Sequence, residues 1–188
     1  MKYNNSWLTE KFKSKEKIKY LFFWGHQPSK DGSITQSCFS QWWQSPFELN
    51  DIRYKTAEHW MMAEKARLFD DSTTLEKILK AKTPAEAKKM GRLVNHFNPA
   101  IWDSNKFQIV VNGNFHKFSQ HEDLKSFLIN TKERVLVEAS PVDNIWGIGM
   151  ATDHEHIENP LKWKGENLLG YALMEVREYL KQFKLDNL

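Results

Sequence analysis

The strongest constraint on the fold is the stretch YKTAEHWMMAEKARLF, residues 54–69. Wound as a helix, it places Glu58 and Lys65 on the same face as two methionines and a phenylalanine. A face with that apolar content is expected to point into the interior, where an unpaired carboxylate or ammonium group is costly. The fold must therefore pair these two charges or place them in a wet cleft.

Glu58 and Lys65 admit two interpretations. Seven helical residues separate them by about 10 Å along the axis, and a long lysine side chain leans back over much of that gap. The structural interpretation is an ion pair, or Lys65 extending past a helix end to water. The functional interpretation is an apolar pocket in which desolvation favours neutral acids and amines, as proton transfer and imine chemistry require.

Size and composition favour one globular domain of 188 residues with a net charge of +3. No run approaches the roughly 18 apolar residues of a membrane span, and the lysine-rich residues 1–18 lack the apolar centre of a secretory signal. We therefore expect no membrane association, a cytoplasmic location and an N-terminal leader over 1–18. The single cysteine, Cys38, excludes an internal disulfide and is expected to pack as a small apolar group.

Regular elements follow from periodicity and capping signals. Thr56 is a plausible N-cap for the first helix, and Thr83, Pro84 and Glu86 form a capping-box start for a helix that Gly91 can end. The patterns predict helices over 56–69, 72–79, 83–91 and 166–183, and strands over 19–25 and 134–139.

The segment FQIVVNGNFHKF, residues 107–118, carries conflicting signals. Asn112-Gly113 between apolar runs is typical of a β-hairpin turn. However, Trp102, Val110 and Lys117 recur at helical spacings. Local rules favour the hairpin.

The segment EASPVDNIWGIGM, residues 138–150, predicts a loop that leaves a strand end. It holds Asp143, Trp146 and Gly147, and its two glycines allow close backbone approach. It is not a dinucleotide fingerprint, because no third glycine follows. It is either a tight turn, with Trp146 packed and Asp143 capping backbone N–H groups, or part of a binding site.

Histidines and isolated cations give weaker signals. His154 and His156 have no third ligand at useful spacing, so no metal site is predicted, and His59 is expected to be packed. Arg92 and Lys117 are plausible phosphate contacts, although such residues are usually ordinary surface charges. The mild positive charge suits a phosphorylated small molecule better than a nucleic acid.

Six segments in this order resemble the NADAR family, which includes the bacterial YbiA-type N-glycosidases of riboflavin intermediates. Together they cover about residues 20–180, and they are FFWG, YKTAEHWMMAEKA, PAEAKKMGRLV, IWDSNKFQIVVNGNFHKFSQ, VLVEASPVDNIWGIGM and NPLKWKGENLLGYALMEVREYL. The resemblance implies a compact, single-domain, mainly α fold with a few short strands (α+β) over residues 19–183, followed by a tail over 184–188. It also implies a helix, not a hairpin, at 107–118.

The resemblance further implies hydrolysis of an N-glycosidic bond without a metal or cofactor. Family members are described as splitting phosphorylated ribosylamino-pyrimidine intermediates into ribose 5-phosphate and the base, and relatives remove ADP-ribose from guanine in DNA or RNA. Both substrates carry an exocyclic nitrogen on the anomeric carbon, which can ring-open to an imine. A non-catalytic module that binds a nucleotide or ADP-ribose is the alternative of another class.

The resemblance gives roles to residues of this chain. Glu58 is expected to be the acid/base, Lys65 an amine that forms a transient Schiff base, and Asp143 an aid to proton transfer or to ribose orientation. Trp146 is expected to stack on the base or shield the site beside Gly147. Further substrate contacts are expected from Trp102, Arg92 and Lys117. Direct attack of water between Glu58 and Asp143 is the alternative to the imine.

Overall fold

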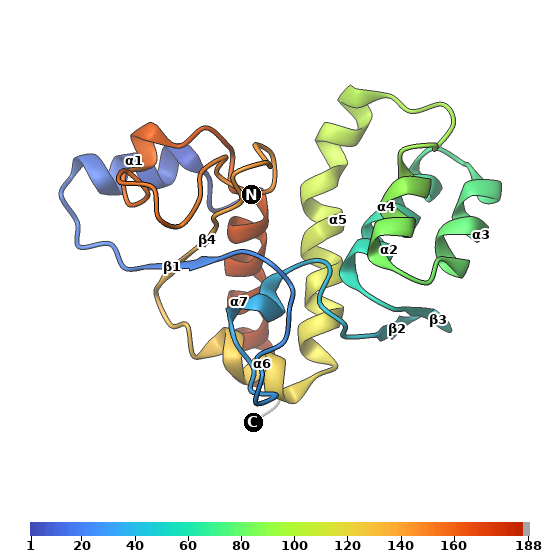
Figure 1. Cartoon of the computed structure of the whole chain (residues 1–188), viewed down its shortest axis with the longest axis horizontal. Helices are drawn as coiled ribbons and strands as arrows, with labels where there is room; N and C mark the ends of the chain where they lie inside the picture. Colours follow the sequence, from blue (N-terminus) through green and yellow to red (C-terminus); the bar gives the residue numbers. More distant parts are fainter. Residues whose placement is uncertain (186–188) are drawn as a thin grey trace. The chain divides into compact units, whose positions relative to one another are not determined.

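A computed structural model describes residues 1–185 and divides them into two units (Figure 1). The first unit is formed by Met1–Ser40 and the chain from Glu122 onward, and the second by Gln41–His121. In the described part of the chain, seven α-helices accompany two 3₁₀ helices and four short strands. The predicted mainly helical α+β class is confirmed.

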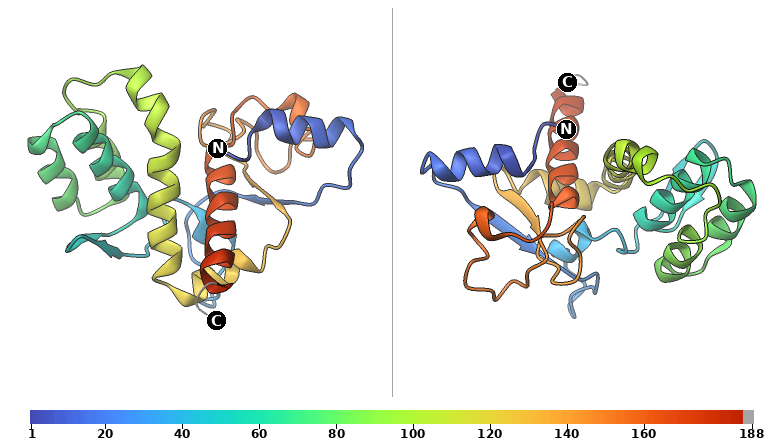
Figure 2. Two further views of the ribbon diagram at one scale, coloured as in Figure 1. Left: turned by 180° about the vertical axis from the view of Figure 1, so that it is seen from behind. Right: turned by 90° about the horizontal axis from the view of Figure 1, so that it is seen from above.

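The second unit is built around helix α2, Ala57–Leu68. The other elements of this unit are β2 (Phe47–Leu49), β3 (Ile52–Tyr54), α3 (Ser72–Lys80), α4 (Pro84–Gly91) and α5 (Pro99–Ser119). Helices α3, α4 and α5 all pack against α2, and Figure 2 shows α3 and α4 beside it. Helix α2 is therefore the core element of this unit.

Helix α2 begins and is buried as the sequence predicts, but more completely. Thr56 is its N-cap, and the Thr56 hydroxyl accepts the His59 N–H. Side chains around nearly the whole circumference of its first turns are buried, including those of Trp60 and Ala63 outside the predicted apolar stripe. Because three helices surround α2, a charge at position 58 is deep whichever way the helix is rotated.

Helix α5 runs through the segment with conflicting signals. The chain from Pro99 to Ser119 is one continuous helix, so the helix implied by the family resemblance is confirmed and the local hairpin signal is wrong. Gly113 lies where a Cβ atom would approach Cδ1 of Trp60 to 2.3 Å. The glycine therefore permits close packing of two helices and forms no turn.

A β-hairpin occurs instead at β2 and β3, a segment for which the sequence analysis predicts no element. Phe47 pairs with Tyr54 in antiparallel register. The turn residues Asn50 and Asp51 have φ values of 52° and 60°, as a type I′ turn requires. The Gln120 side chain closes the outer edge, because its amide accepts the Glu48 N–H at 2.9 Å and donates to the Glu48 carbonyl at 2.7 Å.

The first unit combines a parallel strand pair with the C-terminal helix. Its elements are α1 (Asn5–Lys13), β1 (Tyr20–Phe23), η1 (Gln36–Phe39), α6 (Glu122–Ile129), β4 (Val135–Glu138), η2 (Pro160–Lys162) and α7 (Leu168–Leu185). Strands β1 and β4 pair in parallel from Tyr20 opposite Val135 to Phe23 opposite Glu138. Helix α7 packs on β4, and both predicted strands are confirmed.

One asparagine attaches helix α7 to the strand pair. The Asn167 side chain donates to the Leu136 carbonyl at 2.9 Å and accepts the Glu138 N–H at 2.9 Å, so its amide occupies the place of a third strand. A Cβ atom at Gly170 would lie 2.1 Å from the Leu136 carbonyl oxygen. Glycine at this position lets the helix backbone approach β4 closely.

The N-terminal segment, expected to be a leader over residues 1–18, contains helix α1. Asn4 caps α1 by accepting the Trp7 N–H at 2.8 Å, and Leu8 is fully buried. The helix is tied to the unit because Asn5 donates to the Gly165 carbonyl and accepts the Tyr171 hydroxyl. The predicted C-terminal tail begins inside α7, and residues 186–188 lie outside the described part of the chain.

The remaining predicted helices occur within a residue or two of their expected bounds. In α3 the N-cap is Asp71, one residue before the predicted start. In α4 the Thr83 hydroxyl accepts the Glu86 N–H, but the Glu86 carboxylate returns to the Lys82 N–H and not to that of Thr83. Among the described helices, none is long and apolar enough to cross a membrane.

Candidate functional site

Glu58 lies in the first turn of α2 and is 2% exposed. Its backbone N–H donates to the Gln41 carbonyl at 2.9 Å, which fixes residue 41 against the start of the helix. The positive end of a helix dipole favours a nearby anion. A carboxylate at this depth is the feature that the apolar stripe of the sequence predicts.

Other polar side chains of the second unit are also buried. Gln41 is 7% exposed, and Asn114 and Lys117 are fully buried. Asn114 donates to the Gln41 side-chain oxygen at 2.8 Å, so the two amides touch.

Lys117 differs most from its predicted surroundings. From the sequence, Lys117 is either an ordinary surface charge or a phosphate contact, whereas in the structure its side chain is fully buried on α5. Its Nζ lies 5.0 Å from the centre of the Phe118 ring. Burying an ammonium group is costly, so it marks a site where the charge is needed for the fold or for a ligand.

Lys65 is half-buried and reaches a helix end. Its Nζ donates to the Gly91 carbonyl at the end of α4 at 2.9 Å, and it makes no ion pair within the described residues. Of the two structural alternatives for Lys65, a side chain that extends past a helix end agrees with this contact, whereas an ion pair with Glu58 does not. Burial lowers the pKa of the Lys65 amine, which favours the neutral form that a nucleophile needs.

Aromatic rings surround the Lys65 amine. Its Nζ lies 4.1 Å from the centre of the Phe97 ring and 5.6 Å from the centre of the Trp102 ring. Phe97 is 42% exposed, and Trp102 is half-buried. Arg92, the exposed C-cap of α4, follows directly after the glycine that binds Lys65. The structure thus brings together two predicted site residues, Lys65 and Trp102, and places the backbone of a third, Arg92, next to the glycine that Lys65 contacts.

His59 is packed, as expected. Its Nε2 lies 3.3 Å from the Ala81 carbonyl and its Nδ1 lies 2.8 Å from the Thr56 hydroxyl. A carbonyl can only accept, so Nε2 carries the proton and Nδ1 accepts from Thr56. Burial lowers the pKa of His59, which favours the neutral ring. That ring accepts a hydrogen bond from Thr56, the N-cap of α2.

The loop after β4 belongs to the first unit, and its aspartate has a structural contact. Asp143 Oδ1 accepts the N–H groups of Ile145 at 2.9 Å and Trp146 at 2.8 Å. This is the capping arrangement that the sequence analysis weighs against a catalytic role. Trp146 is half-buried, so part of its indole remains at the surface.

Gly147 is required by backbone packing. A Cβ atom there would lie 2.9 Å from the Glu138 carbonyl oxygen and 3.0 Å from that of Asp143. The Gly147 carbonyl itself accepts the Asn167 N–H at 3.1 Å. The close backbone approach that the sequence predicts is made here by the chain's own backbone, as in the tight-turn alternative.

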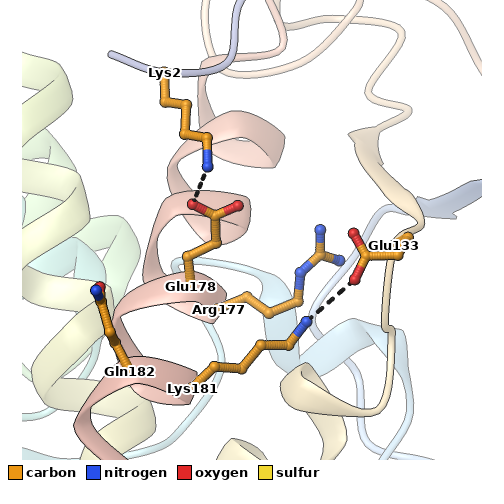
Figure 3. Close-up of a pocket in the computed structure, with 6 residues that line it drawn as sticks. All are labelled: Lys2, Glu133, Arg177, Glu178, Lys181 and Gln182. Carbon is orange, nitrogen blue, oxygen red and sulfur yellow. Dashed lines mark hydrogen bonds and ion pairs between the residues drawn. The ribbon is translucent and has the colours of Figure 1, made fainter.

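A cavity of about 370 Å³ in the first unit contains none of the predicted site residues (Figure 3). Arg177 lines it, is 3% exposed, and donates to the Thr131 hydroxyl and the Arg134 carbonyl. At its rim Lys2 pairs with Glu178 at 2.6 Å. Lys181 pairs with Glu133 at 3.4 Å across the same rim. These contacts secure the N-terminal segment and the end of α7.

The described part of the chain contains no cluster of side chains that could form a metal site. No three His, Cys, Asp or Glu side chains there are placed to hold a metal ion. His154 and His156 lie on a loop of the first unit, where the His156 N–H donates to His154 Nδ1 at 3.1 Å.

Gln41 and Asn114 are not among the site residues predicted from the sequence. Neither stands in a motif that local rules associate with chemistry, and Asn114 follows the Asn-Gly pair that suggests a turn. A signal was nevertheless present: once 107–118 is helical, Asn114 and Lys117 lie one turn apart on the same face. Gln41 has no such signal, because its position depends on a contact across 73 residues of sequence.

Comparison with known proteins agrees with this architecture. A family model described as the NADAR domain matches residues 22–181. "N-glycosidase R617" of Acanthamoeba polyphaga mimivirus is 43% identical over 172 residues, which cover 89% of this chain and 99% of the relative. "N-glycosidase YbiA" of Escherichia coli (strain K12) is 34% identical over 144 residues, which cover 77% of this chain and 79% of the relative.

A solved structure shows the same fold. The NMR structure of the E. coli protein YbiA superposes with a TM-score of 0.70 and 31% sequence identity, and it covers 90% of this chain and 89% of that one. The matched region spans both units and includes every predicted site residue. This chain belongs to the NADAR domain family.

Proposed function

We propose that this protein is a hydrolase of N-glycosyl bonds that acts on a phosphorylated ribosylamino-pyrimidine and releases ribose 5-phosphate and the base. Relatives at 43%, 33% and 34% identity are named N-glycosidases, which supports the reaction class. The small phosphorylated substrate is supported by the family resemblance and by the mild net charge of +3.

The observation that carries the proposal is the depth of Glu58. The carboxyl group of Glu58 is 2% exposed in the first turn of the core helix. An apolar residue would pack there as well without the cost of burying a carboxyl group, so packing alone does not explain the glutamate. In an N-glycosidase it serves as the acid/base that opens the sugar ring and later activates water. The Gln41 carbonyl anchors the helical turn that carries Glu58, and the Gln41 side chain contacts that of Asn114 within the same unit.

Lys65 is the proposed nucleophile, an amine that forms a transient imine with the sugar. In this pathway Glu58 assists opening of the ribose to an imine at C1, and the neutral Lys65 amine adds to that carbon. The base departs with its exocyclic nitrogen as an amine, and water then hydrolyses the lysine imine to release the sugar. Burial, which lowers the pKa of Lys65, supports this role. Its contact with the Gly91 carbonyl must open before attack.

Trapping with borohydride separates the imine from direct attack of water. With the ribosylamino-pyrimidine present, the imine pathway predicts a stable adduct that is absent from Lys65→Ala. An active enzyme that gives no adduct follows the water pathway, in which two carboxylates stabilise an oxocarbenium-like state. Asp143 is the proposed second carboxylate or ribose-orienting group, and Trp146 is proposed to stack on the base.

A product assay tests the proposed function directly. The protein is incubated with the ribosylamino-pyrimidine phosphate and, separately, with ADP-ribosyl-guanine in an oligonucleotide, and products are identified by mass. Release of ribose 5-phosphate supports the proposal, and release of ADP-ribose identifies the nucleic-acid substrate instead. Binding without turnover of either compound identifies a non-catalytic module.

A further inference from the structure

The side-chain amides of Gln41 and Asn114, here called the amide pair, have a fixed polarity. Asn114 Nδ2 lies 2.9 Å from the Val110 carbonyl and 2.8 Å from Gln41 Oε1. A carbonyl oxygen can only accept, so the atom facing Val110 must be the nitrogen, and both of its hydrogens are used. Gln41 must then turn its oxygen toward Asn114, which leaves its own nitrogen on the other side.

Two polar atoms of the amide pair have no hydrogen-bond partner. These are Asn114 Oδ1, an acceptor, and Gln41 Nε2, a donor. Asn114 is fully buried and Gln41 is 7% exposed, so water does not readily satisfy either atom. Leaving a buried donor or acceptor without a hydrogen bond costs about 1–3 kcal/mol of folding free energy. Protein interiors therefore rarely retain two such unsatisfied groups side by side unless the groups have a function.

The amide pair is linked through the Gln41 backbone to the helical turn that carries Glu58, the proposed catalytic residue. The Gln41 carbonyl accepts the Glu58 N–H at 2.9 Å, so its side chain branches from the residue that anchors the first turn of α2. Asn114 projects from α5, which packs against that same helix. All of these contacts lie within the second unit.

We propose that the amide pair binds the lactam edge of the substrate base, a ring N–H beside a ring carbonyl; this rests on the proposed function. The ring N–H donates to Asn114 Oδ1, and the ring carbonyl accepts from Gln41 Nε2. An anion is a poor ligand, because the Asn114 oxygen would repel it. Pyrimidinones and guanine both carry a lactam edge, so the pair selects the class of base and leaves the sugar to other residues.

Binding of free bases tests this proposal without requiring turnover. Calorimetry compares 2,6-diaminopyrimidin-4-one, which has the lactam edge, with 2,6-diamino-4-methoxypyrimidine, which lacks both the ring N–H and the carbonyl. The wild-type protein is expected to prefer the lactam by about tenfold or more, the usual effect of losing a paired donor and acceptor. Ribose 5-phosphate serves as the sugar probe.

Gln41→Glu is the diagnostic variant. It keeps an oxygen that accepts from Asn114 and replaces only the unpaired donor, so the lactam preference is expected to fall to near one. Gln44→Glu is the matched control, because it makes the same change three residues later on an exposed side chain and should leave the preference unchanged. Gln41→Met provides a second test, with an uncharged side chain, if the buried carboxylate of Gln41→Glu prevents folding.

The outcomes separate this proposal from the proposed function. A wild-type protein that binds both bases equally, or neither, overturns the proposal even if it cleaves substrate. A Gln41→Glu protein that loses affinity for ribose 5-phosphate and keeps the lactam preference shows that the pair contacts the sugar, which also overturns it. A lactam preference that disappears in Gln41→Glu supports the amide pair whether or not turnover is found.

Discussion

Gly113 and Trp60 fix the distance between the two longest helices of the second unit. A Cβ atom at Gly113 would lie 2.3 Å from Trp60 Cδ1, and the indole Nε1 donates to the Ile109 carbonyl at 2.8 Å. The indole therefore lies directly on the α5 backbone. This contact explains why glycine occupies a helical position where it carries an entropic cost.

Gly113→Ala is expected to destabilise the protein by about 1–3 kcal/mol, because the methyl group overlaps a rigid buried indole. Asn112→Ala is the matched control, since Asn112 is exposed on the same helix and alanine has the higher helix propensity. Urea unfolding should show a loss for the first variant and none for the second. Destabilisation by Asn112→Ala alone would indicate a turn at these residues.

Glu58→Gln is expected to lower kcat by roughly 10²–10⁴-fold, the usual contribution of a positioned acid/base. The amide is nearly isosteric, so the thermal unfolding midpoint should change little. Steady-state kinetics on the ribosylamino-pyrimidine phosphate and a melting curve check both parts. Unchanged turnover in a folded variant would remove Glu58 from the mechanism, and a fall in stability alone would make it structural.

Two substitutions can distinguish the structural role of Asp143 from a catalytic role. Asparagine keeps the Oδ1 acceptor for the Ile145 and Trp146 N–H groups, whereas alanine removes it. Asp143→Ala is expected to lose about 0.5–2 kcal/mol of stability, and Asp143→Asn much less. If the carboxylate takes part in the reaction, both variants lose turnover. Full activity in Asp143→Asn would limit the residue to capping.

Lys65 provides a test based on pH. Because its amine must be neutral to attack and burial lowers its pKa, turnover by the imine pathway should rise with pH as the amine loses its proton. Lys65→Met should abolish both the turnover and the borohydride adduct. A pH profile of kcat that Lys65→Met leaves unchanged would favour water as the nucleophile.

The carboxylate of Asp71 is expected to make the protein less stable as the pH falls into the acid range. Its carboxylate accepts the Thr74 N–H at 2.9 Å, and the backbone and side-chain N–H groups of Asn95 at 2.9 Å. These bonds lower its pKa to about 2, below the value of about 3.9 in an unfolded chain. The stabilisation is therefore complete above about pH 5 and is lost as the pH falls toward 2.

Acid titration of Asp71→Asn tests this expectation. The variant should show a shallower loss of stability between about pH 5 and 2 than the wild type, since it no longer binds an extra proton on unfolding. Asp70→Asn, at the adjacent exposed position, is the matched control and should keep the wild-type slope. Parallel curves for the wild type and Asp71→Asn would show that the carboxylate contributes nothing to acid sensitivity.

The sequence alone determined the elements whose signals are local. Thr56 and Thr83 cap the helices they were predicted to start, because a cap needs only the next three residues. The apolar stripe of 54–69 predicted that Glu58 faces the interior, and its side chain is 2% exposed. The order of six family segments predicted the fold class and membership of the NADAR domain family, which the family model then confirmed.

Only the tertiary structure decided how distant residues combine. Whether Asn112-Gly113 forms a turn depends on the indole of Trp60, which lies on another helix far away in the sequence and overrides the local preference. Lys117 could not be placed inside from its own charge, and the partner of Asn114 lies 73 residues earlier. Burial and hydrogen bonding between distant segments have no short-range signature, because they arise only when helices pack and exclude water from the groups between them.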